Sequence, residues 1–123
     1  MIKIRKPNLQ LIYVSVITTS TEYYKKLFNI EPFFVTPRYV AFKIDGDADF
    51  AIWSGGDVPD KNAPRYSEIG INLNSDDEVV AFYNELKGTD DIHIEKELYT
   101  EVFGKTFLVK DPDGHIIRVS SKD

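Results

Sequence analysis

The sequence predicts an α+β fold built from two consecutive βαβββ repeats. The first observation is that strand and helix patterns follow the order strand, helix, three strands twice within 123 residues. The second is that the two helical segments repeat side chains at matching spacing: Phe82, Tyr83, Leu86 and Gly88 follow the spacing of Tyr23, Tyr24, Leu27 and Asn29. We expect one domain over residues 1–123, with repeat one at about 8–53, a linker at 54–67 and repeat two at about 68–121.

The first repeat opens with alternating residues 9–16, apolar on both faces, which predict a strand covered on both sides. Residues 18–29 predict an amphipathic helix with hydroxyl residues at its N-cap, Tyr24, Leu27 and Phe28 as its buried stripe and Asn29 at its C-cap. The segments PFFVTP, YVAFKI and DFAIW complete the repeat as strands, and a turn at 45–48 joins the last two.

The second repeat follows a stretch rich in Gly, Pro, Asp and Asn. The segment IGINLNS predicts a strand, and residues 76–88 predict a helix with acids in its first turn and Gly88 as a left-handed stop. Strands follow at IHIEKELY, KTFLVK and HIIRVSS. In each first strand we expect one face, Ile12 and Val14 or Ile71 and Leu73, to pack under the helix.

Composition excludes several classes of function. The chain has no cysteine, which removes disulfides, thiolate metal sites and cysteine nucleophiles. A net charge of -5 argues against a nucleic-acid partner, and no apolar run has the length of a membrane span or a signal peptide. We therefore expect a cytoplasmic protein with no nucleic-acid and no membrane partner.

These features together resemble a known superfamily. Two βαβββ units, a YV strand leading into a helix with an aromatic pair, and a final DPDG turn are similar to the glyoxalase, bleomycin resistance protein and extradiol dioxygenase superfamily, also called vicinal oxygen chelate. The resemblance covers about the whole chain. It implies that each repeat curls a mixed sheet into a half-cup, that paired half-cups enclose a ligand cavity, and that the protein is a homodimer.

The resemblance also implies four positions for metal ligands. On this sequence they fall on Leu9, Ala51, Gly70 and, after the DPDG turn, Arg118. None of these side chains coordinates a divalent ion, and the permanently cationic arginine repels one. The sequence therefore predicts a metal-free member without a cofactor. We expect the two histidines, His93 and His115, to be exposed or locally hydrogen-bonded.

Hairpin register and strand alternation predict which residues line the cup. Four-residue loops at DGDA and DPDG pair Phe42 with Ala51 and Phe107 with Arg118. Arg118 is expected to clamp an anion or stack on a ring, and Trp53 to stack on the ligand. Residues 97–105 form either a lid or a loop that only packs its own aromatics. The predicted ligand-binding residues are Tyr13, Phe42, Trp53, Asn72, Phe107 and Arg118.

Three functions stay open. The first is metal-independent binding of a small aromatic or hydrophobic molecule, with sequestration as in antibiotic resistance. The second is a glyoxalase-like lyase or isomerase, or a dioxygenase-related enzyme, in which Glu68, Asp49 or Tyr13 is the base and Arg118 stabilises an enolate-like charge. The third is a regulatory module whose cavity has been lost. The sequence contains no nucleophile motif, and we assign no catalytic residue.

Overall fold

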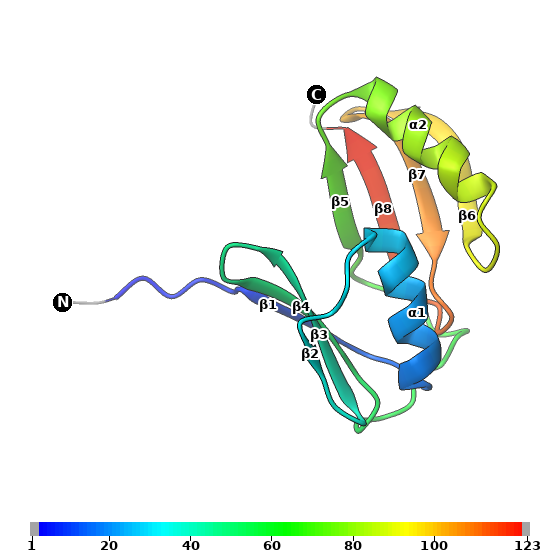
Figure 1. Cartoon of the computed structure of the whole chain (residues 1–123). Coiled ribbons are helices and arrows are strands. Elements are labelled where there is room, and N and C mark those ends of the chain that lie inside the picture. The colour runs from blue at the N-terminus through cyan, green and yellow to red at the C-terminus, as the bar shows by residue number, and fades with distance from the viewer. Residues whose placement is uncertain (1–2, 122–123) are drawn as a thin grey trace. The chain divides into compact units, whose positions relative to one another are not determined.

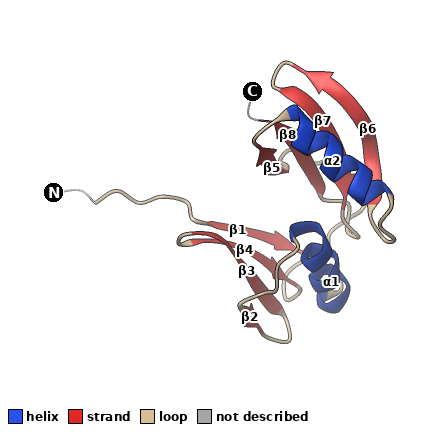
Figure 2. Ribbon diagram, turned by 45° about the horizontal axis from the view of Figure 1, so that its top comes forward, coloured by secondary structure: helices blue, strands red, loops and turns tan. Residues whose placement is uncertain are grey.

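The chain forms two compact units, which we describe separately. The computed structural model describes residues 3–121. The first unit ends at Pro59, and the second begins at Asp60. Each unit combines one helix with four strands, and these elements are labelled in Figures 1 and 2. The first contains β1 (Leu9–Tyr13), α1 (Ile17–Phe28), β2 (Phe34–Val35), β3 (Tyr39–Asp45) and β4 (Ala48–Trp53). The second contains β5 (Ile69–Leu73), α2 (Asp76–Lys87), β6 (His93–Glu101), β7 (Gly104–Lys110) and β8 (Ile116–Ser121).

Both units have the same strand topology. The order is β1-β4-β3-β2 in the first sheet and β5-β8-β7-β6 in the second. The first strand of each unit pairs in parallel with the last, and the other pairs are antiparallel. The helix follows the first strand directly, as the crossover between parallel strands requires. The predicted α+β fold of two βαβββ repeats is confirmed.

Helix α1 covers one face of the first sheet. Tyr24 and Phe28 contact the ring of Phe50, with centroids 4.9 and 5.2 Å apart. Asn29 ends the helix in the left-handed conformation, as predicted (φ 56°). The expected hydroxyl N-cap is wrong, because Val16 occupies that position without a side-chain hydrogen bond.

Helix α2 covers one face of the second sheet. Ser75 caps it through its side chain, which accepts a hydrogen bond from the Glu78 backbone N–H, and the Glu78 carboxylate accepts one from Asn74. Gly88 ends the helix at φ -90°, so the predicted left-handed stop is wrong. Among residues 3–121, neither helix is long and apolar enough to cross a membrane.

Both long hairpins differ from the predicted register by one residue. In the first, a bulge between Lys43 and Asp45 makes Phe42 pair with Phe50 instead of Ala51. In the second, Lys110 pairs with Ile116 instead of His115. The Asp111 carboxylate explains the longer loop, because it accepts hydrogen bonds from the backbone N–H groups of Asp113 and His115.

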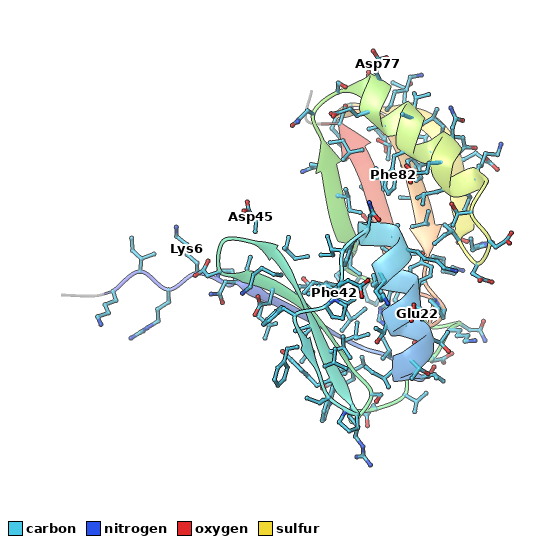
Figure 3. All side chains as sticks on the ribbon, viewed as in Figure 1. Lys6, Glu22, Phe42, Asp45, Asp77 and Phe82 are labelled. Carbon is cyan, nitrogen blue, oxygen red and sulfur yellow. The ribbon has the colours of Figure 1, made fainter. Side chains whose placement is uncertain are left out.

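This one-residue difference moves two predicted site residues to the opposite face. Phe42 lies 5.8 Å from the ring of Phe28 on α1, and Figure 3 shows it between the sheet and that helix. Phe107 contacts Phe82 and Tyr83 of α2, at 6.0 and 5.2 Å between ring centroids. Both side chains are fully buried, so they belong to the cores of their units.

Candidate ligand-binding faces

The functional candidates lie on the distal face of each sheet, by which we mean the face turned away from that unit's own helix. Residues paired across strands share a face, and Ile12 and Ile52, buried as a pair, mark the helix side of the first sheet. The alternate positions Tyr13 and Trp53 are paired with each other on the distal face. Tyr39 pairs with Trp53 from the other side.

The distal face of the first unit carries an aromatic row. The ring of Tyr39 lies 6.5 Å from Trp53 and 6.1 Å from Phe34 in edge-to-face geometry. Trp53 and Tyr39 are partly exposed, and Tyr13 is 44% exposed. Tyr39 supplies the ring opposite Trp53, and Ala41 takes the place opposite Ala51 that was predicted for Phe42. Rings that remain accessible can stack on a planar molecule.

Two consecutive glycines support these rings. A Cβ atom on Gly55 would collide with the indole of Trp53, and one on Gly56 would lie 2.8 Å from the ring of Tyr13. Any larger residue in this loop would therefore displace the aromatic side chains. The sequence showed the Gly pair only as a turn signal, because its contact with Trp53 and Tyr13 is set by tertiary structure.

An ion pair stands on the same distal face. Lys43 pairs with Asp49 across β3 and β4, with Nζ 2.6 Å from Oδ1, and the same ammonium lies 4.6 Å from the ring centre of Phe33. Asp49 was considered as a base from sequence. In the structure it is the partner of a lysine, so its negative charge is balanced on this face.

The distal face of the second unit is polar and contains open space. Ile117 and Val119 lie under α2, so the alternate residues Arg118 and Ser120 lie on the distal face, paired with Gly70 and Asn72 of β5. Ser120 donates a hydrogen bond of 3.0 Å to the Asn72 side-chain oxygen. A Cβ atom on Gly70 would meet nothing within 4 Å. Gly70 therefore leaves room directly beside Arg118.

Arg118 is the centre of a hydrogen-bonded cluster. Its Nε and Nη2 donate to the two carboxylate oxygens of Glu68 at 2.6 and 3.0 Å, and its Nη1 donates to the Tyr99 hydroxyl at 3.0 Å. The ring of Phe103 lies 5.6 Å from the guanidinium carbon. The hydrogen bonds to Glu68, followed by the one to Tyr99, raise the pKa of Arg118 above its ordinary value. We call Glu68, Tyr99, Phe103 and Arg118 the arginine cluster.

The arginine cluster corrects the expected environment of Arg118. Leu108, not Phe107, is its cross-strand neighbour on β7. Tyr99 and Phe103 come from the predicted lid segment, and their contacts show that this segment packs its aromatics against the distal face. Glu68, one of the candidate bases named from the sequence, lies two residues before Gly70, the partner of Arg118, so strand alternation places it on the same face.

The four positions that the resemblance assigns to metal ligands lie on the distal faces. Leu9 and Ala51 share that face in the first unit, and Gly70 and Arg118 are paired in the second. Within residues 3–121, no three His, Asp or Glu side chains gather as a metal-binding group. His93 is exposed and lies 3.2 Å from Glu95, and the backbone of His115 bonds to Asp111.

Comparisons with known proteins agree with the topology and define the family. The model of the Glyoxalase/Bleomycin resistance protein/Dioxygenase superfamily matches residues 7–119, so the chain belongs to this superfamily. It is 56% identical over 119 residues, 95% of this chain and 92% of the other, to the phenazine antibiotic resistance protein EhpR of Enterobacter agglomerans.

Solved structures share the fold at low sequence identity. The solution structure of protein ATC0852 from Agrobacterium tumefaciens is similar with a TM-score of 0.80 and 22% identity, covering 98% of this chain and 99% of that one. A glyoxalase/bleomycin resistance protein/dioxygenase from Alicyclobacillus acidocaldarius has a TM-score of 0.76 and 16% identity, with 97% and 95% covered. These structures support the fold alone.

Proposed function

We propose that this protein binds a planar aromatic antibiotic of the phenazine type and sequesters it unchanged. The observation that carries this proposal is the 56% identity, over nearly the whole chain, to a phenazine antibiotic resistance protein. The accessible row of Tyr13, Tyr39 and Trp53 supports it, because a flat three-ring molecule gains most of its affinity from stacking and apolar contact.

Binding in this proposal is independent of a metal ion. The residues at the four superfamily positions, Leu9, Ala51, Gly70 and Arg118, have no side-chain donor for a divalent cation. A phenazine ring needs none, since stacking and hydrogen bonds supply the affinity. The homodimer expected from the resemblance stays a prediction.

Sequestration fits the arrangement of acids better than catalysis does. Both oxygens of Glu68 accept hydrogen bonds from Arg118, and Asp49 is paired with Lys43. A general base must have an oxygen directed at the proton it removes. The two carboxylates considered as bases are instead committed to neighbouring cations.

Replacing Trp53 tests the binding proposal. We expect Trp53→Ala to weaken binding of a neutral phenazine, phenazine-1-carboxamide, about tenfold, because one stacked ring and its buried area are lost. Calorimetry measures the dissociation constant of the ligand for both proteins. Quenching of Trp53 fluorescence gives an independent measure of binding in the wild type. The matched control is Tyr66→Ala, which removes an aromatic ring that is 95% exposed. Equal affinities for wild type and Trp53→Ala would contradict stacking on this residue.

A further inference from the structure

The charge preference of the second distal face depends on Glu68. Arg118 alone would place an uncompensated cation beside the open space at Gly70. Glu68 engages one edge of the guanidinium through two hydrogen bonds, which is the bidentate geometry that a ligand carboxylate would otherwise adopt. The carboxylate that this arginine recognises is therefore already supplied by the protein.

The remaining hydrogen-bonding capacity of Arg118 is small. A guanidinium has five N–H bonds, and Glu68 and Tyr99 accept three of them in the described part of the chain. Phe103 covers part of the guanidinium. The arginine cluster therefore offers a few N–H donors from an ion pair with no net charge, and such donors suit a ring nitrogen or a carbonyl oxygen.

We propose that Glu68 is a specificity-determining residue that neutralises Arg118 and prevents the site from favouring anionic aromatic ligands over neutral ones. This inference rests on the proposed function, because it describes which members of the phenazine class the second distal face favours. Glu68 acts by occupying and balancing Arg118, and a ligand carboxylate must displace it to reach the same edge. The Glu68 and Arg118 side chains are only partly exposed, 38% and 27%, so solvent screens their interaction incompletely.

The test compares two ligands of one shape and different charge. Phenazine-1-carboxylate and phenazine-1-carboxamide are titrated into each protein by calorimetry, and the ratio of their dissociation constants is recorded. In Glu68→Gln we expect the affinity for the carboxylate to rise about tenfold relative to the affinity for the carboxamide, because the guanidinium edge is released for the ligand. In Arg118→Gln the ratio should shift the other way, because Glu68 then repels the anion.

The matched control is Glu97→Gln. It changes net charge by the same amount, and Glu97 faces Lys87 of α2 at 3.8 Å, on the helix side of the second unit. We expect its ratio to equal that of the wild type. An equal shift in Glu97→Gln, or ratios unchanged in both Glu68→Gln and Arg118→Gln, would overturn the inference. Failure of the wild type to bind either compound would instead count against the proposed function.

Discussion

At the scale of the residue, Gly70 leaves open space beside Arg118 that packing of the fold does not require. Gly70 lies within strand β5, and a Cβ atom on it would meet nothing within 4 Å. We expect Gly70→Val to keep or raise stability by about 0.5–1 kcal/mol, because glycine is unfavourable in a strand and valine is favourable. The same side chain would occupy the space beside Arg118 and weaken phenazine binding.

Urea denaturation and calorimetry check the two parts of this prediction. Gly88→Ala is the control, since its Cβ would make only ordinary contacts of 3.7 Å at the end of α2, and binding should be unchanged. Wild-type affinity in a stably folded Gly70→Val protein would show that the ligand does not use this space.

Individual residues also show how far the sequence predicted the candidate site. Tyr13, Trp53, Asn72 and Arg118 lie on the distal faces as expected, although their contact with a ligand stays a prediction. Phe42 and Phe107 lie on the helix side, because a bulge and an aspartate-bonded loop changed two registers by one residue. These local features of turns and bulges are not revealed by the alternation of residues along a strand.

At the scale of the element, one aspartate connects the start of α2 to two strands. Asp76 accepts a hydrogen bond of 2.9 Å from the Lys105 backbone N–H of β7 and one of 2.8 Å from the Ser121 hydroxyl of β8. These hydrogen bonds, first that from Lys105, lower the pKa of Asp76 below its ordinary value. The folded protein thus holds the carboxylate in its ionised form.

The pH dependence of stability follows from this lowered pKa. The unfolded chain takes up the proton more readily than the folded one, so the stabilisation is complete above about pH 4 and is lost as pH falls further, through the folded pKa. We expect Asp76→Asn to lower the urea midpoint at neutral pH, with the difference from wild type shrinking in acid.

Urea denaturation at a series of pH values measures this effect. Asp77→Asn, at the neighbouring position labelled in Figure 3, removes a charge from the same helical turn and leaves the two hydrogen bonds in place. A constant difference between wild type and Asp76→Asn down to the acid limit would contradict the assignment.

The order of helices and strands was predictable because it depends on the periodicity of apolar residues over whole segments. Both helices begin and end within one residue of the expected positions, and every strand of the two repeats is present. The N-cap of α1 and the stop at Gly88 were not predicted correctly, since cap geometry depends on the neighbouring packing.

At the scale of the whole molecule, the chain belongs to the superfamily and carries Leu9, Ala51, Gly70 and Arg118 at the four positions that the resemblance assigns to metal ligands. Leu9 and Ala51 are apolar, Gly70 leaves space, and Arg118 forms an ion pair with Glu68. The aromatic row lies on the same face of the first sheet as Leu9 and Ala51. The arginine cluster lies on the same face of the second sheet as Gly70. Strand alternation places Glu68 and Arg118 on the same face, but their hydrogen bonds depend on side-chain conformations that residue patterns do not reveal.

We propose that the protein retains a phenazine without a metal ion and without changing it. The most direct measurement is equilibrium dialysis of chelator-treated protein against phenazine-1-carboxamide, followed by mass spectrometry of the released compound. We predict saturable retention and full recovery of the intact compound. Retention that appears only after a divalent ion is restored would show that binding depends on a metal, and recovery of a chemically altered product would show catalysis.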